Sequence, residues 1–175
     1  MKKIIILLMF AGLLFLSSTK MFAQEYLLPY PGMLPDHSLY KIKVLRDKVT
    51  LLLMRDPIKR AAKHLQMADK ELFAALKLAE KDNMALAQQT AFKAEHHMTL
   101  LVGEIAKAVY YSNREFPRDL AQRSHQATLK HQELLAGMMA RAKEDEQEAF
   151  QTIKEFSIRN NQELFKLAEE AATPR

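Results

Sequence analysis

The 175-residue chain contains no cysteine, no tryptophan and only four glycines. The lack of cysteine excludes disulfides, thiolate nucleophiles, thiolate metal ligands and lipid attachment at a lipobox cysteine. Four glycines are too few for most phosphate-binding loops, and the sequence contains neither a nucleophile elbow nor an H-E-x-x-H pair. We therefore expect a protein that is not an enzyme, with no catalytic residue and no cofactor.

Leucine, alanine, lysine, glutamate, glutamine and methionine dominate the composition. Hydrophobic residues make up 49% of the chain and charged residues 27%, which is typical of a folded rather than a disordered protein. The dominant residues lose little side-chain freedom in a helix. The composition therefore predicts an all-α protein, and the length suits one domain.

Positive and negative charges nearly balance. If the first 23 residues are removed, Lys2, Lys3 and Lys20 leave with them, and 23 of the 26 Lys and Arg remain against 21 Asp and Glu. Basic residues are interspersed with acidic residues along the helical segments, which favours a solvated surface that carries many ion pairs. Because nucleic-acid binding needs a clustered basic face, we expect no nucleic-acid partner.

The N-terminus has the features of a secretory signal peptide. Lys2 and Lys3 precede an apolar run from Ile4 to Leu16, which is shorter than the roughly 20 residues that span a bilayer. Ala23 supplies a small residue before a cleavage site at Gln24. We predict a signal peptide over residues 1–23, an extracytoplasmic location (periplasmic or secreted) and no stable membrane span after processing. An uncleaved anchor is the alternative.

Residues 24–37 are rich in proline. Pro29, Pro31 and Pro35 are too close together for a helix, and each pushes the residue before it towards an extended conformation. We expect an extended arm that packs along the helices, because its apolar side chains would be poorly placed in water; a tethered linker is the alternative. These side chains are Tyr26, Leu28, Tyr30, Met33 and Leu34.

The first helix is expected to begin after Asp36 or Ser38, either of which can act as its N-cap. Asp56 is predicted to cap the next helix, with Pro57 at its first position, and that helix closes near residues 81–83. Each segment has an apolar stripe at three-and-four spacing, which is expected to align on one side of the helix and to be buried where the helices pack side by side. The stripe of the first segment is Leu39, Ile42, Leu45, Val49, Leu52 and Leu53.

Three further segments complete the pattern. From Met84 the apolar residues hold heptad spacing over four repeats, as in a coiled coil, so this helix should lie nearly parallel or antiparallel to its neighbours. A break at residues 112–117 precedes the next segment. Residues 141–148 lack Gly and Pro, so either one helix continues or a turn lies near Lys143; the separate stripe from Phe150 to Leu167 favours the turn. We predict an antiparallel up-and-down bundle of four to five amphipathic helices over residues 38–175.

The opening of the mature chain resembles that of a known family. The segment from Tyr26 to Lys41, followed by Arg55-Asp56-Pro57, is similar to the opening of exported bacterial and archaeal helical proteins catalogued as domain of unknown function 5667. The resemblance implies fold and compartment, and it supplies no catalytic residues. The residues that carry it are Tyr26, Leu28, Pro29, Tyr30, Pro31, Gly32, Leu34, Pro35, Asp36, Tyr40, Lys41, Arg55, Asp56 and Pro57.

Six histidines and ten methionines make metal binding worth testing. His96 and His97 are adjacent, and His125 and His131 are six residues apart, so neither pair has the four-residue spacing that places two ligands on one helix face. Met84, Met98 and Met138 lie on apolar stripes, where thioethers fill core gaps. We expect no metal site; His96, His97, His125 and His131 are the candidates if one exists.

Long amphipathic helices without site chemistry favour a non-enzymatic protein-binding or structural module of the cell envelope. Its partner is expected to be an envelope protein or the cell surface, and the pattern does not indicate an oligomeric state. An extracytoplasmic metal- or stress-responsive binder that uses His and Met residues is the alternative. A hydrolase would need a concave polar cluster on facing helices, whereas the carboxylates here are expected on solvated helix surfaces.

Overall fold

The computed structural model describes residues 25–172, so the predicted signal peptide lies outside the described residues. This range contains helices and no strand, which confirms the all-α prediction. No helix within it combines the length and apolar character needed to cross a bilayer. The helices are α2 (Tyr40–Leu53), α3 (Pro57–Ala79), α4 (Met84–Tyr111), α5 (Arg118–Met139) and α6 (Glu144–Ala172).

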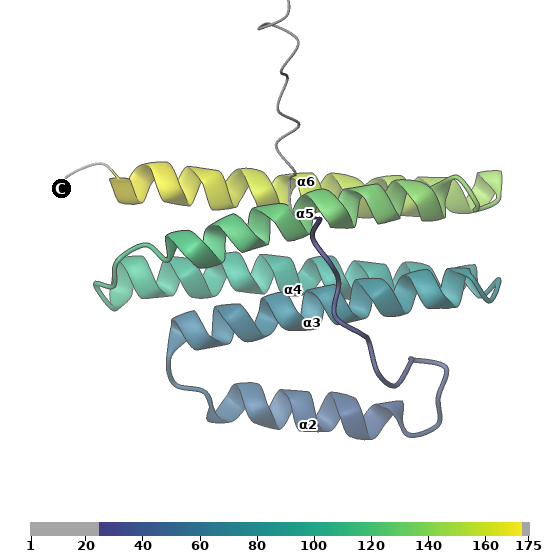
Figure 1. The fold of residues 1–175 in the computed structure, drawn as a ribbon, viewed down its shortest axis with the longest axis horizontal. Helices are drawn as coiled ribbons and strands as arrows, with labels where there is room; N and C mark the ends of the chain where they lie inside the picture. The colour runs from purple at the N-terminus through teal and green to yellow at the C-terminus, as the bar shows by residue number, and fades with distance from the viewer. Residues whose placement is uncertain (1–24, 173–175) are drawn as a thin grey trace, which may run out of the picture.

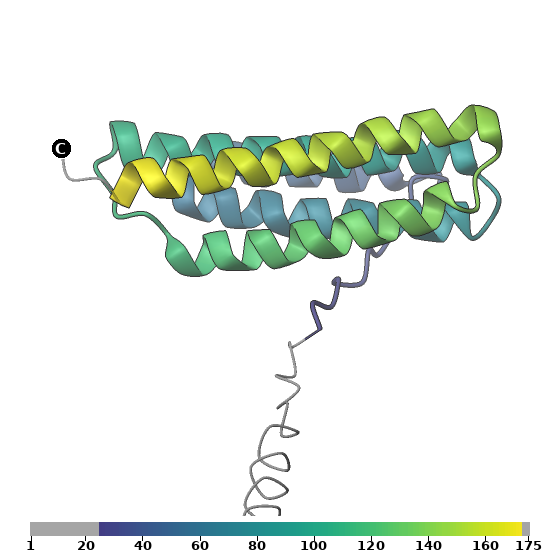
Figure 2. The ribbon, with the colours of Figure 1, turned by 90° about the horizontal axis from the view of Figure 1, so that it is seen from above.

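Helices α3 to α6 form a four-helix bundle, and the chain reverses direction at each connection (Figures 1 and 2). Helix α3 packs against α4 and α5, and α6 packs against the same two helices. The antiparallel neighbours are therefore α3 with α4 and α5 with α6, while α4 and α5 lie diagonally across the bundle. Helix α2 lies outside this group, alongside α3 (Figure 1).

The bundle core consists of two apolar clusters, one towards each end. The first lies near the α3–α4 and α5–α6 turns and contains Leu72, Ala91, Leu135 and Phe150, all without exposed surface. The second contains Ala61, Met98, Leu120 and Leu164, among others. Alanines in the first half of α4 (Ala87, Ala91, Ala94) are fully buried.

The helix ends follow local sequence signals. Asp56 accepts hydrogen bonds from the backbone N–H groups of Ile58 (2.8 Å) and Lys59 (3.2 Å), and Pro57 starts α3, as predicted. Asp82, with φ of 59°, turns the chain between α3 and α4. Residues 140–143 separate α5 from α6, so the favoured turn near Lys143 is confirmed.

Two expectations for the first helix are wrong. The N-cap position of α2 is Leu39, which makes no side-chain cap, whereas Asp36 instead pairs with Lys81 of the α3–α4 turn at 2.7 Å. The apolar stripe of α2 also does not enter the core. The two apolar clusters are built by α3 to α6, whose own stripes close around each other.

The proline-rich arm packs on the bundle over part of its length. Tyr26 contacts the second apolar cluster, and Pro31 is buried. Gly32 adopts φ of 72°, in the left-handed region that glycine enters without strain. Tyr30 is 78% exposed, so the packing predicted for the arm does not extend to this side chain.

Candidate functional site

A layer of polar side chains lies between the two apolar clusters. Each bundle helix contributes one member: Asp69 from α3, Glu95 from α4, His131 from α5 and Asn160 from α6. Glu95 and His131 have no exposed surface, and Asp69 and Asn160 are also buried. The centre of the bundle is therefore polar, which is costly unless every group is paired.

The imidazole ring of His131 lies between two carboxylates. Its Nδ1 is 2.8 Å from Oε1 of Glu95, and its Nε2 is 3.1 Å from Oδ1 of Asp69. Burial alone lowers the pKa of His131, but the hydrogen bonds and charges of the two carboxylates outweigh it and raise the pKa to about 9. His131 is therefore an imidazolium at neutral pH, and both ring nitrogens donate.

The other carboxylate oxygens of this layer are also hydrogen-bonded. Tyr26 of the arm donates its hydroxyl to Oδ2 of Asp69 at 2.7 Å. Asn160 donates its Nδ2 to the backbone oxygen of Glu95 at 3.0 Å, and Oε2 of Glu95 lies 3.4 Å from the same nitrogen. The layer is thus a closed ion network that joins all four helices and the arm. Its polar atoms are therefore engaged with each other, as burial requires.

A second set of polar contacts holds α2 on α3 and α4. Tyr40 donates its hydroxyl to Oε2 of Glu71 at 2.7 Å, and Oε1 of Glu71 lies 3.2 Å from Nζ of Lys93 and 3.5 Å from Nζ of Lys43. Asp47 also points inward and is buried. Burial, followed by the charge of Glu71, raises the pKa of Tyr40. Helix α2 therefore faces the bundle with the side that carries Tyr40, Lys43 and Asp47.

The opposite side of α2 is apolar and exposed. Its side chains recur at three-and-four spacing and form one continuous stripe, which we call the outer face of α2. This face consists of Leu39, Ile42, Leu45, Val49, Leu52 and Leu53, with exposed fractions of 50%, 62%, 62%, 46%, 81% and 74%.

Two buried histidines form a pair at the α3–α4 contact. The Nδ1 atoms of His64 and His97 are 3.2 Å apart, so one ring donates to the other. Burial lowers the pKa of His64 to about 4 and that of His97 to about 3, since a charged ring would lose its hydration there. Both rings are therefore neutral at physiological pH, in contrast to His131.

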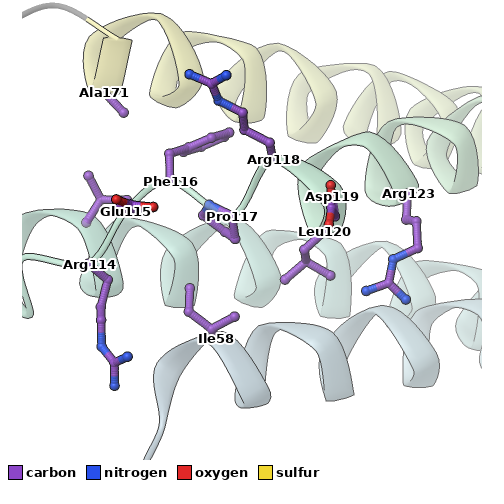
Figure 3. A pocket seen from close by; sticks show the side chains of 11 residues that line it. Ile58, Arg114, Glu115, Phe116, Pro117, Arg118, Asp119, Leu120, Arg123 and Ala171 are labelled. Carbon is purple, nitrogen blue, oxygen red and sulfur yellow. The ribbon is translucent and has the colours of Figure 1, made fainter.

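A hollow of about 810 Å³ lies at the end of the bundle where α3 and α5 begin. Figure 3 shows Phe116, Pro117 and Ile58 on its wall and three arginines around it. Arg118 points towards α6, whereas Arg114 and Arg123 point away from it, so their guanidinium groups do not converge (Figure 3). The hollow therefore presents no focused charge for a ligand.

The structure does not bring the four candidate histidines together. His96 is exposed, and its ring centroid is 6.4 Å from that of His97. Nδ1 of His125 lies 3.0 Å from Oδ1 of Asn161. His131 is enclosed in the polar layer, and Met98 and Met138 lie in different apolar clusters. Among residues 25–172, no group of three or more His, Asp or Glu side chains is placed to hold a metal ion.

Five of the residues that carry the family resemblance make structural contacts. Tyr26 bonds Asp69, Asp36 pairs with Lys81, and Tyr40 bonds Glu71, so the opening motif fastens the arm and α2 to the bundle. Asp56 and Pro57 start α3.

Sequence reasoning missed the polar layer and placed the carboxylates on the surface. That expectation is wrong for Asp47, Asp69, Glu71, Glu95 and Glu104, which are buried. A signal was present, because polar residues occupy positions of the apolar stripes: Ser157 and Asn160 fill the gap between Ile153 and Leu164 in α6. A charged or amide residue in register with a core stripe indicates a buried network when another stripe carries a histidine.

Comparison with known proteins identifies one family. The family model described as Domain of unknown function (DUF5667) matches residues 32–173. No curated protein and no solved structure matches the chain.

Proposed function

The chain belongs to the family described as Domain of unknown function (DUF5667), and from that premise we propose that it is an exported, non-enzymatic binding module of the cell envelope. Its contact surface is the outer face of α2. The signal-peptide features of residues 1–23 support the compartment. The proline-rich arm and the four-helix bundle form the scaffold that presents α2.

The exposure of the outer face of α2 carries this proposal. Full burial of a Leu, Ile or Val side chain stabilises a protein by roughly 1.5–3 kcal/mol. Five such side chains on α2 and Leu39 at its N-cap are 46–81% exposed, so this face leaves most of that stabilisation unrealised. Contiguous apolar surface of this kind is typical of an interaction site.

The buried polar network supports a role other than catalysis. His131 has both ring nitrogens engaged by carboxylates and no exposed surface, so it has neither a free nitrogen for proton transfer nor access to a substrate. The network is better explained as a device that fixes the helix register, because mispaired helices would leave buried charges without partners.

Photo-cross-linking in living cells tests the proposal. A photoreactive amino acid at Leu52 of α2 should give adducts with an envelope component, because this side chain is 81% exposed. The matched control is Ile158, an aliphatic residue of α6 that is 38% exposed, and it should give none. Cell fractionation and mass spectrometry of the N-terminus should find the protein outside the cytoplasm. A cytoplasmic protein that yields no adduct from α2 would refute the proposal.

Metal binding is a second candidate because of the His64–His97 pair. The Nδ1 atoms of His64 and His97 are 3.2 Å apart, which matches the separation of two nitrogens that bind the same Zn²⁺ ion at about 2.0–2.1 Å each. Within residues 25–172 no third His, Asp or Glu completes this pair, so water would supply the other ligands. Calorimetric titration with zinc and copper should show saturable binding that His64→Ala abolishes and His96→Ala preserves; absence of saturable binding removes this candidate.

A further inference from the structure

We propose that the outer face of α2 docks on the surface of an anionic lipid bilayer, with its aliphatic side chains at the boundary between headgroups and acyl chains. This inference rests on the proposed function, since it identifies the partner that covers the same face. The observations that carry it are the charges beside the stripe, the kind of side chain within it, and the way in which α2 is attached.

Every exposed charged side chain of α2 is a cation. Lys41 and Lys48 are four and three residues from Leu45, so they border the stripe on one edge, and Arg46 borders it on the other. The only acid of the helix, Asp47, is buried on the inward side and pairs with Arg46 at 2.9 Å, so Lys41 and Lys48 are the exposed cations that this acid does not pair with. Two further exposed cations lie nearby, Arg55 in the α2–α3 connection and Lys59 in the first turn of α3, with the half-buried Asp56 between them.

An apolar stripe with cationic edges matches the chemistry of an anionic membrane surface. In such an arrangement aliphatic side chains enter the acyl boundary, while long Lys and Arg side chains extend towards the phosphates. Each cation near a negatively charged bilayer adds to the attraction. An uncharged bilayer would lack this second contribution, so the edge charges make the surface selective for anionic lipid.

The same features disfavour protein partners. In a contact between two copies of α2, the cationic edges formed by Lys41 and Lys48 would meet each other, and Asp47 is already paired with Arg46 at 2.9 Å. Protein interfaces also rely on buried aromatic side chains, whereas the outer face of α2 contains only leucine, isoleucine and valine. A flat, deformable apolar phase suits such a stripe better than a shaped protein pocket.

Docking requires no rearrangement of the fold. Helix α2 is the outermost element on its side of the molecule (Figure 1), and its contacts with the bundle are made by Tyr40, Lys43 and Asp47 on the inward side. The outer face can therefore meet a bilayer while the inward contacts stay in place. Helix α6 packs against α4 and α5 on the far side of the bundle and provides an internal control.

The absence of cysteine in the natural chain allows a site-specific test. Val49→Cys and Ile158→Cys, 46% and 38% exposed in the parent, would each carry one polarity-sensitive fluorophore on the protein recovered after export. The vesicles would contain brominated lipids as quenchers, either with phosphatidylglycerol or with phosphatidylcholine alone. Equal thermal unfolding midpoints would show that the variants fold.

We expect vesicles with phosphatidylglycerol to blue-shift and quench the label at position 49 and to leave the label at position 158 unchanged. Phosphatidylcholine alone should bind far more weakly. Combining Val49→Cys with Lys41→Gln and Lys48→Gln should weaken binding roughly thirtyfold, because two surface cations are removed. The comparison of the two positions holds even if the leader is retained as an anchor, since both labels then share it.

Three results would overturn the docking proposal. One is equal quenching at positions 49 and 158. Another is a label at 49 that ignores vesicles but shifts as protein concentration rises, which would identify a second copy as the partner. The third is a label at position 49 whose fluorescence does not change with vesicles, together with photo-cross-links from position 52 to an envelope protein. The last two results leave the proposed function standing. If the label at position 49 shows no change and the photoreactive residue at position 52 gives no adduct, both proposals are removed.

Discussion

At the scale of single residues, His131 has the most demanding environment in the bundle. It is fully buried, and its positive charge lies between the negative charges of Asp69 and Glu95 from two other helices. A buried ion network contributes little net stability when complete, because the hydration lost by its members offsets their attraction. Removing His131 is different, since the two carboxylates then keep only the hydrogen bonds from Tyr26 and Asn160 and have neither water nor an opposite charge.

His131→Leu should therefore be strongly destabilising. The substitution leaves two carboxylates facing each other in the core, and we expect the free energy of unfolding to fall by about 3–5 kcal/mol. Urea unfolding at pH 7, followed by circular dichroism, measures this change. His96→Leu is the matched control: His96 is exposed, so its replacement should change stability by about 0.5 kcal/mol or less.

A triple variant separates the network from simple loss of packing. Replacing Asp69, Glu95 and His131 together by apolar residues removes all three charges, and it should cost less than His131→Leu alone. If the triple variant were instead the less stable of the two, the polar layer would contribute stability in its own right.

At the scale of elements, α2 and α6 show opposite outcomes of one pattern. Both have apolar residues at three-and-four spacing. In α6 this stripe enters the core through Phe150, Ile153, Leu164 and Leu167, whereas in α2 it faces outward. The surface of α3 and α4 that α2 covers carries charged groups such as Glu71 and Lys93, and these attract the polar side of α2.

Paired truncations of leucine test this difference. Leu72→Ala in the bundle core should lower the free energy of unfolding by about 2–5 kcal/mol, because it leaves a cavity. Leu45→Ala on α2 should lower it by about 0.5 kcal/mol or less, since Leu45 is already 62% exposed. Both values come from urea unfolding of the purified protein. A cost for Leu45→Ala close to that of Leu72→Ala would mean that α2 packs its stripe inward.

At the scale of the whole molecule, three buried histidines make stability depend on pH in opposite directions. The folded-state pKa of His131 is raised to about 9 from 6.5, so its contribution is complete below pH 6.5 and is lost as the pH rises through 9. His64 and His97 have lowered pKa values, so their contributions are present above pH 6.5 and are lost as the pH falls towards 4 and 3.

We therefore expect the free energy of unfolding to be greatest near pH 6.5. It should decline by up to about 3 kcal/mol between pH 6.5 and 9 through His131. Urea unfolding at intervals of half a pH unit measures the profile. His131→Leu should remove the alkaline decline and keep the acid one; an unchanged alkaline decline in this variant would assign it to other groups.

The sequence by itself determined the all-α class, the positions of the helix breaks and the apolar residues of α3 to α6. These features are local: Asp56-Pro57 starts a helix wherever it lies, and helical spacing aligns a stripe regardless of its partner. Only the tertiary structure decided which side of α2 faces the bundle and which groups surround His131. The apolar stripes of α3 to α6 already close around the core. Helix α2 therefore packs on a charged surface, and its orientation depends on residues that are far away in the sequence.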